Sequence, residues 1–182
     1  RRYVEAGFLL RKGGPGRGST FEAFNPSGLL DVWREAYDFS KHDLRAGHIV
    51  SRTGEELLRT LAGKLEEHGV DYAATGLAAA WLIEPFAMFR LVTVYVRDWP
   101  SEDLLRELRF HEDPKGANVW LVRPNDEGVF DGGEERDGIR HVSAVQTYLD
   151  LKAEPERAEE AAEELRKSHL TWGEESGTQT DA

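Results

Sequence analysis

The sequence predicts a mixed α/β (α+β) domain in which helices flank a small mixed sheet, and three observations support this fold class. Helical and extended patterns alternate along most of the chain. One long amphipathic helix, at 53–69, carries cap signals at both ends. A β-branched run at 91–96 is apolar at nearly every position, as in a strand that is buried on both faces.

The composition excludes several classes of protein. Of the 182 residues 40% are hydrophobic and none is cysteine, so we expect a folded core without disulfides or thiolate metal sites. The longest apolar stretch, 73–83, is shorter than the roughly 20 residues that span a bilayer, and no signal-peptide flanks surround it. We therefore expect a soluble, cytoplasmic protein that does not enter a membrane.

The N-terminal residues predict a β-hairpin with a long cationic tip. An apolar run at 3–10 leads into a glycine-rich basic loop at 11–18, and an alternating run follows at 19–24. In winged-helix proteins such a hairpin, the wing, lies along the DNA backbone, where positive charge binds phosphates without reading the sequence. An ordinary solvated loop is the alternative interpretation of the same residues.

The formal net charge of −11 is unevenly divided along the chain. Residues 1–20 hold a balance of +4, so the other 162 residues hold −15. This asymmetry predicts a basic contact surface attached to an acidic body. The candidate DNA-binding residues are Arg1, Arg2, Arg11, Lys12 and Arg17.

Cap signals locate the next helices. Asn25 precedes a helix at 28–37 that has apolar residues on one face, and Thr53 with Glu56 forms a capping box for the helix at 53–69. Between these helices the pattern predicts two elements, a polar loop at 39–46 and a short strand at 48–51.

The rest of the chain continues the alternation of helices and strands. Its predicted elements are a short strand at 70–74, a helix at 76–83, the buried strand at 91–96, a helix from Ser101, a strand at 117–122, an acidic loop at 125–137, a strand at 138–142, and helices at 143–151 and 155–170.

The turn at Gly76 is the strongest candidate for catalysis, and the residues near it argue against an enzyme. A strand, a glycine and a helix followed by a second strand resemble the nucleotidyltransferase fold, where two acidic residues on the second strand hold Mg²⁺. Here Val94, Tyr95 and Val96 stand at those positions. We therefore expect a nucleotidyltransferase-like domain without catalytic acids, metal or cofactor.

The other polar clusters predict turns. The six histidines show no metal-site spacing, and adjacent His111, Glu112 and Asp113 project in different directions. The acidic loop at 125–137 lacks the alternating oxygen ligands of a calcium loop.

Several motifs together resemble one family. They are Asn25-Pro-Ser-Gly-Leu-Leu-Asp-Val-Trp33, Asp71-Tyr-Ala-Ala-Thr-Gly-Leu-Ala-Ala-Ala80, Gly116-Ala-Asn-Val-Trp-Leu121, Val145-Gln-Thr-Tyr-Leu-Asp-Leu151 and Glu156-Arg-Ala-Glu-Glu-Ala-Ala162. In this order and spacing they resemble the AbiEi-like antitoxins of type IV toxin–antitoxin and abortive-infection systems. The resemblance covers most of residues 3–170.

The resemblance implies a transcriptional regulator in which a winged helix binds double-stranded promoter DNA and a second domain acts as antitoxin. It also implies a functional link to a nucleotidyltransferase toxin, which such proteins neutralise without a stable complex. On this basis residues 1–27 are the remnant of the winged helix, 28–172 the antitoxin domain and 173–182 a flexible tail. We expect 1–6 to be the end of a recognition helix, preceded by further residues in the complete protein.

Two other functions stay open at this stage. One is a nucleotidyltransferase-fold enzyme whose metal ligands are displaced, for example to Asp98, Asp126 or Asp131; two carboxylates beside the Gly76 turn would favour it. The other is a protein-interaction module whose small-residue helix, at 155–170, packs on a partner or on a second copy. The oligomeric state is not predicted.

Overall fold

The chain divides into two compact units. The hairpin unit comprises Arg1–Tyr37 with Leu170–Ala182, and the α/β unit comprises Asp38–His169. The computed structural model describes residues 9–12, 20–23, 25–85 and 88–172. The predicted functional boundaries at residues 27 and 172 stay predictions.

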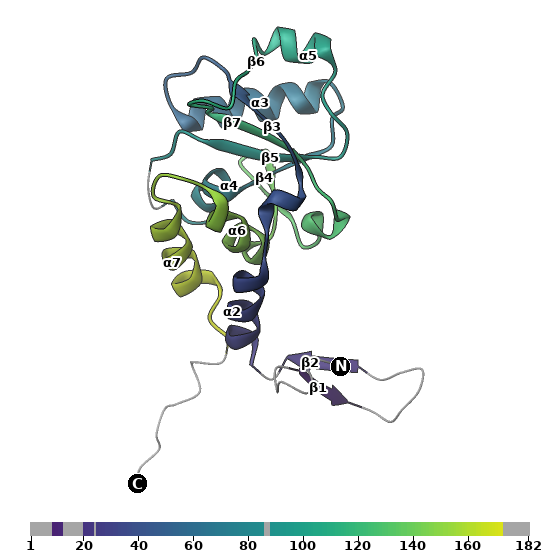
Figure 1. The fold of residues 1–182 in the computed structure, drawn as a ribbon, viewed down its shortest axis with the longest axis vertical. Coiled ribbons are helices and arrows are strands. Elements are labelled where there is room, and N and C mark those ends of the chain that lie inside the picture. The colour runs from purple at the N-terminus through teal and green to yellow at the C-terminus, as the bar shows by residue number, and fades with distance from the viewer. Residues whose placement is uncertain (1–8, 13–19, 24, 86–87, 173–182) are drawn as a thin grey trace. The chain divides into compact units, whose positions relative to one another are not determined.

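The hairpin unit contains the predicted antiparallel pair of strands. β1 (Leu9–Lys12) pairs with β2 (Thr20–Ala23), with Leu9 opposite Ala23 and Lys12 opposite Thr20 (Figure 1). The paired strands confirm the hairpin for these residues. The remainder of the predicted apolar run, the loop tip at 13–19 and the predicted recognition-helix end at 1–6 lie outside the described residues.

The helix predicted at 28–37 is observed, and it begins two residues earlier, directly after Asn25. α2 (Pro26–Ala36) starts with a proline at its first position, and the Asn25 side chain accepts a hydrogen bond from Gly28 N at 2.8 Å. An asparagine N-cap satisfies one of the N–H groups that have no partner within a helix, and proline there removes another. Local chemistry therefore fixes this start.

The α/β unit is built on a seven-stranded mixed sheet with the order β6-β3-β7-β5-β4-β9-β8. β5 runs parallel to β7 and β4 runs parallel to β9, while the other described neighbours are antiparallel. The strands are β3 (Asp43–His48), β4 (Tyr72–Thr75), β5 (Val92–Val96), β6 (His111–Glu112), β7 (Val119–Arg123), β8 (Glu134–Arg136) and β9 (Ile139–His141).

Helices cover both faces of this sheet, so the predicted mixed α/β class is confirmed. α3 packs on β4, β5 and β9, whereas α4 and α6 pack on β4 from the other face (Figure 1). α7 packs in turn on α4 and α6. The helices and 3-10 turns are η1 (Phe39–Lys41), α3 (Gly54–Glu67), α4 (Gly76–Ile83), α5 (Glu102–Glu107), η2 (Glu127–Phe130), α6 (Ala144–Asp150), η3 (Leu151–Ala153) and α7 (Ala158–His169).

Strand β5 lies in the middle of the core, as its apolar composition predicts. All five of its residues are buried, and β4 and β7 pair with its two edges. Side chains alternate between the faces of a strand, so Val92, Val94 and Val96 point to one face while Thr93 and Tyr95 point to the other. The second face therefore carries polar groups into the core.

The helix predicted at 53–69 is observed as α3 with both of its caps. Thr53 Oγ1 accepts a hydrogen bond from Glu56 N at 3.1 Å, and Glu56 Oε2 accepts one from Arg52 N at 3.0 Å. Gly69 follows the helix with a φ of +67°. The Thr53 cap and the left-handed glycine are therefore local features of the two helix ends, while Glu56 engages the amide before the N-cap instead of the N-cap amide itself.

The predictions for 39–46 and 48–51 are wrong. η1 and β3 occupy the first segment, and 49–51 follow the strand. Gly47 is the only buried residue of β3, so the strand lacks the apolar alternation that would reveal it. The extended conformation of β3 is stabilised by pairing with β7, from the pair Asp43–Arg123 to the pair Gly47–Val119.

Two boundaries near the C-terminus also differ from the predictions. The segment 125–137 is not a plain loop, because it holds η2 and the edge strand β8, which pairs with β9. The last helix begins at Ala158 rather than at Pro155, since Glu156 has a φ of +65° and cannot lie within a right-handed helix. No helix in the described ranges is long and apolar enough to cross a bilayer.

Candidate functional site

The turn at Gly76 brings together the most unusual group of polar side chains in the α/β unit. β4 ends at Thr75 and α4 begins at Gly76, whose φ is +57°. This conformation favours glycine, and a Cβ at the same position would overlap the carboxyl group of Glu154. Backbone conformation and space therefore both require glycine here.

Strand register places three hydroxyl groups beside this turn. Thr75 lies opposite Thr93 in the β4–β5 ladder, and Tyr95 shares the face of Thr93 two residues further along β5. The facing segment, at the end of α6 and after η3, supplies Asp150 and Glu154. All five side chains are buried, and we refer to them as the Gly76 cluster.

Asp150 is held by three neutral donors. Its Oδ2 accepts a hydrogen bond from Thr75 Oγ1 at 2.6 Å, and its Oδ1 accepts from Tyr95 OH and Gln146 Nε2, both at 3.0 Å. A buried carboxyl group is tolerated when its oxygens are hydrogen-bonded in this way. Asp150 thus ties α6 to the two central strands.

Glu154 closes the N-terminus of α4. Its Oε2 lies 2.7 Å from Leu77 N, which donates, and its Oε1 lies 2.5 Å from Thr93 Oγ1. Burial raises the pKa of Glu154 to about 8, against the lowering effect of the bonds from Thr93 and Leu77, and the charges of Asp150 and Glu156 add to the rise. The neutral acid is therefore favoured at neutral pH.

His42 extends the cluster on its far side. Asn125 N donates to His42 Nδ1 at 3.2 Å, so the neutral ring carries its proton on Nε2, which lies 3.2 Å from Tyr95 OH. Burial is the largest effect on His42 and lowers its pKa, which favours this neutral form. A continuous hydrogen-bonded chain results, from His42 through Tyr95 to Asp150.

This arrangement contains two carboxyl groups beside Gly76, the feature that would favour an enzyme. Each oxygen of Asp150 and Glu154 lies within hydrogen-bond distance of a hydroxyl, amide or backbone group of the protein itself. The end of α4, where an anionic substrate would bind, is occupied by Glu154. Within the part of the chain that the structure describes, no group of three or more His, Asp or Glu side chains could hold a metal ion.

The aspartates named as alternative ligands lie elsewhere and do not converge. Asp98 is exposed after β5. Asp126 caps η2 by accepting a hydrogen bond from Gly128 N at 2.7 Å, and Asp131 is the exposed residue at the other end of η2. The β5 side chains differ from the prediction: Val94 and Val96 lie on the opposite face, and the residues of β5 that reach the cluster are Thr93 and Tyr95.

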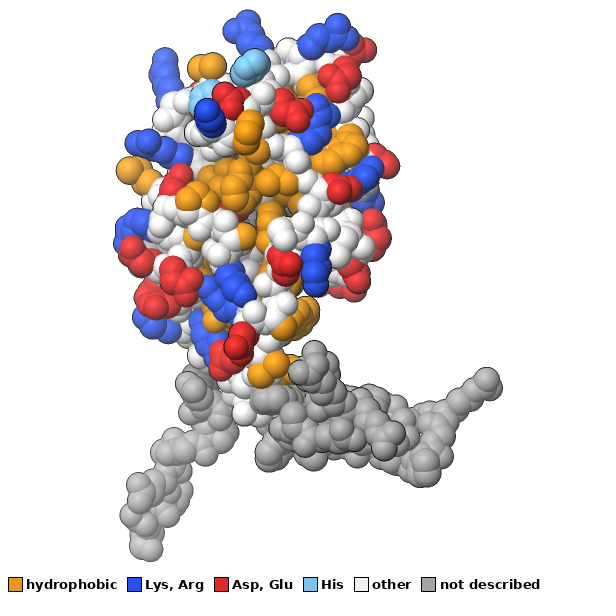
Figure 2. All heavy atoms as spheres, in the orientation of Figure 1, with side chains coloured by type: hydrophobic (Ala, Val, Ile, Leu, Met, Phe, Trp, Pro, Cys, Tyr) orange, Lys and Arg blue, Asp and Glu red, His pale blue; other side chains and the backbone are white. Residues whose placement is uncertain are grey.

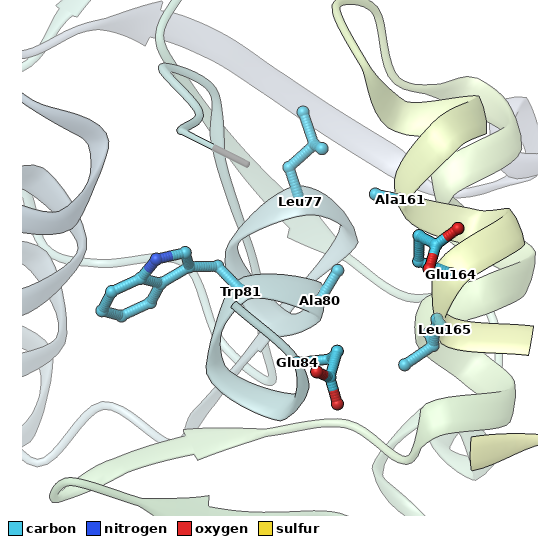
Figure 3. Close-up of a pocket in the computed structure, with 7 residues that line it drawn as sticks. All are labelled: Leu77, Ala80, Trp81, Glu84, Ala161, Glu164 and Leu165. Atoms are coloured by element: carbon cyan, nitrogen blue, oxygen red, sulfur yellow. The ribbon is translucent and has the colours of Figure 1, made fainter. Parts of the chain in front are cut away.

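The small-residue helix proposed as an interaction surface is used within its own unit. Ala161 and Leu165 of α7 are buried and face Leu77 and Ala80 of α4 across a hollow of about 10 Å³ (Figure 3). That volume is about enough for one water molecule. The apolar stripe therefore packs on α4 and is not available to a partner.

The candidate DNA-binding residues are only partly within the described chain. Arg11 and Lys12 lie in β1, where their backbones pair with Phe21 and Thr20. Arg1, Arg2 and Arg17 lie outside the described residues. On the face drawn in Figure 2, the described basic and acidic side chains alternate around a central group of hydrophobic ones, with no continuous basic area.

Sequence reasoning missed both acids of the Gly76 cluster. A charged residue on the buried side of the helix predicted at 143–151 was a usable signal for Asp150, since it had to find partners inside the core. Glu154 gave no such signal, because it follows a helix and precedes a proline, as many exposed acids do.

The fold and this internally hydrogen-bonded cluster define a mixed α/β domain whose central turn is filled by its own side chains. Comparison with protein families identifies the domain further: residues 23–171 match the family model described as transcriptional regulator, AbiEi antitoxin, type IV TA system. The chain belongs to this AbiEi family. No curated protein and no solved structure matches it.

Proposed function

We propose that the chain acts as a transcriptional regulator and antitoxin of a type IV toxin–antitoxin system, with residues 28–172 as the antitoxin domain. The observation that carries this proposal is the family match over residues 23–171, which spans the whole α/β unit. The motifs that resemble this family are distributed over the same region.

The basic N-terminal segment is proposed to contact promoter DNA as a wing. Its support is the charge of +4 in residues 1–20 of an otherwise acidic chain, together with the hairpin formed by β1 and β2. A basic hairpin of this kind binds phosphates and gives salt-dependent affinity without reading the sequence.

The α/β unit is proposed to be a nucleotidyltransferase-like domain without catalytic activity. The support is the Gly76 turn, where Glu154 takes the position at the end of α4 that a phosphate group would need. A buried carboxyl group there excludes other anions by volume and, when ionised, by charge. The proposal therefore assigns this unit a binding or regulatory role.

Promoter binding is tested with the complete gene product and a fluorescent duplex of its own promoter, titrated at several salt concentrations. We expect log K to fall linearly with log salt, and the double substitution Arg11→Ala/Lys12→Ala to reduce the slope by about 1–2. Arg106→Ala is the matched control, since Arg106 is an exposed arginine of α5. The absence of promoter affinity at low salt would refute the regulatory half of the proposal.

Antitoxin activity is tested separately: a nucleotidyltransferase gene is sought beside this one, and its product is co-expressed with the chain. We expect the chain to restore growth without forming a complex that survives size-exclusion chromatography. Growth arrest that persists at full expression of folded protein would refute the antitoxin half.

A further inference from the structure

A second region of the α/β unit forms an open cleft that the proposed function does not use. Two adjoining hollows, of about 560 and 530 Å³, share a wall made by the start of α3, the residues before β5 and the residues before α7. Ligand sites in proteins commonly measure 300–1,000 Å³. The shared lining residues, which define the Arg52–Arg90 cleft, are Arg52, Thr53, Gly54, Arg90 and Glu156.

Positive charge is available in this cleft although the chain as a whole is acidic. Arg52 and Arg90 are both exposed, and no ion pair with a described residue engages either guanidinium group. Glu55, an acid in the lining, is by contrast paired with Arg59 at 3.2 Å. Two guanidinium groups in one cleft offer planar, multiple donors to phosphate oxygens.

The charge of these arginines matters here more than the helix end beside them. The Thr53 side chain already engages Glu56 N at the start of α3, and the Glu56 carboxylate accepts from Arg52 N beside it. An anion in the cleft therefore gains its contacts from the two side chains. The site is in this respect unlike a phosphate loop.

An aromatic wall lines one of the two hollows. The rings of Trp81 and Phe89 lie 5.9 Å apart, and Met88 stands at the rim with 94% of its surface exposed. The Phe89 backbone passes so close to Gly54 that a Cβ there would overlap it, which fixes the wall against α3. The two rings are inclined by 51° and Phe89 is buried, so Trp81, which is partly exposed, is the ring whose face can accept a nucleobase by stacking.

Glu156 lies at the junction of the two hollows in a conformation that is uncommon for its type. Its φ is +65°, and its Oε2 accepts a hydrogen bond from Arg90 N at 3.2 Å. Backbone strain at a non-glycine residue is frequent in ligand sites, where it presents a side chain in a fixed direction. A carboxylate there accepts hydrogen bonds from ribose hydroxyls or from the amino group of a base.

We propose that the Arg52–Arg90 cleft binds a nucleoside phosphate. The phosphates contact Arg52 and Arg90, the base stacks on Trp81, which Phe89 supports from within the core, and Glu156 accepts hydrogen bonds from the nucleoside. The ligand thereby occupies a site distinct from the filled Gly76 turn. Binding in this cleft gives the α/β unit a small-molecule input that does not depend on promoter binding.

Calorimetric titration of the complete protein with ATP, GTP, CTP and UTP tests the proposal. We expect at least one of them to bind with a stoichiometry of 1:1 and a Kd of about 1 mM or tighter, while its free nucleoside and pyrophosphate bind at least about tenfold more weakly. Saturable binding by none of the four overturns the proposal. Pyrophosphate that binds as tightly as the nucleotide overturns the role of the aromatic wall.

Substitutions locate the binding. Arg52→Gln and Arg90→Gln should each weaken the nucleotide by about tenfold, whereas Arg106→Gln, in an arginine that pairs with Asp103 on α5, should leave it unchanged. A base stacked on Trp81 should also change the tryptophan fluorescence of the protein. Trp81→Phe should retain the binding but remove most of this change. Circular dichroism and promoter affinity, measured on the same variants, should match the parent. Equal weakening by Arg106→Gln would place the ligand elsewhere.

Discussion

The Gly76 cluster and the Arg52–Arg90 cleft lie at the starts of two helices in the same unit. They differ in which groups accept hydrogen bonds from the backbone amides of the first helical turn. The start of α4 is buried and receives Glu154 from a segment 77 residues away in sequence. The start of α3 is exposed and is capped by Thr53, three residues from the amide that it accepts. A buried helix end must take its partner from the core, whereas an exposed one can use local residues or a solute.

This difference explains why one site is closed and the other open. Asp150 is hydrogen-bonded to the hydroxyl group of Thr75 on β4, and Glu154 to that of Thr93 on β5. The two carboxyl groups fill the turn, so no space is left for an anion at Gly76. Beside the start of α3, by contrast, an open cleft is lined by Arg52 and Arg90. The predictions below test how strongly each helix start depends on these partners.

The largest effect is expected from Gly76→Ala. The new Cβ would overlap Glu154 and would also impose a left-handed conformation on alanine, so we expect a loss of about 3 kcal/mol or more in the free energy of unfolding. Urea denaturation measures it. Gly69→Ala is the matched control, because Gly69 has a similar φ of +67° but open space around it, and should cost only about 1 kcal/mol. Equal losses would show that Glu154 does not fill the turn.

The second test is the pH dependence of stability. The pKa of Glu154 is raised in the folded protein to about 8 from an ordinary value of 4.5, so the folded state retains a proton that the unfolded state loses. Its contribution is complete below pH 4.5 and declines by about 1.4 kcal/mol per pH unit up to about pH 8. Glu154→Gln, which cannot titrate, should flatten this part of the profile. An unchanged slope would assign the dependence to other groups.

How far the sequence predicted these features depended on whether each signal was local. The capping box of α3 and the apolar run of β5 lie within a few residues, and both were predicted correctly. β3 was missed because its strand conformation depends on pairing with β7 and is not encoded by its own, mostly polar residues. Tertiary pairing overrides local propensity in such strands.

The candidate sites follow the same rule. Gly76 and the absence of acids from β5 were apparent in the sequence, since they concern adjacent residues. The pairing of Thr75 with Asp150 and of Thr93 with Glu154 joins residues at least 61 positions apart. The Arg52–Arg90 cleft with its aromatic side likewise combines four separate segments, so no single motif could predict it.

A moderate effect is expected from Tyr95→Phe. The hydroxyl group of Tyr95 donates to Asp150 at 3.0 Å and lies 3.2 Å from His42 Nε2, so its removal leaves two buried polar groups with one partner fewer. We expect a loss of about 1–2 kcal/mol in the free energy of unfolding. Combining it with Thr75→Val in a double-mutant cycle should reveal a coupling of about 0.5 kcal/mol or more, because both hydroxyl groups donate to Asp150. Strict additivity would mean that they act independently.

The smallest effect is expected from Thr53→Ala, which removes the local cap of α3. The loss of one exposed cap bond should cost about 1 kcal/mol in thermal or urea denaturation, clearly less than Gly76→Ala costs at α4. Thr60→Ala, at an exposed position inside α3, is the control and should change stability by no more than about 0.5 kcal/mol. Because the guanidinium groups of Arg52 and Arg90 are retained, nucleotide affinity should fall by less than about threefold. A loss at Thr53 as large as that at Gly76 would show that the exposed start of α3 depends on its partner as strongly as the buried start of α4 does.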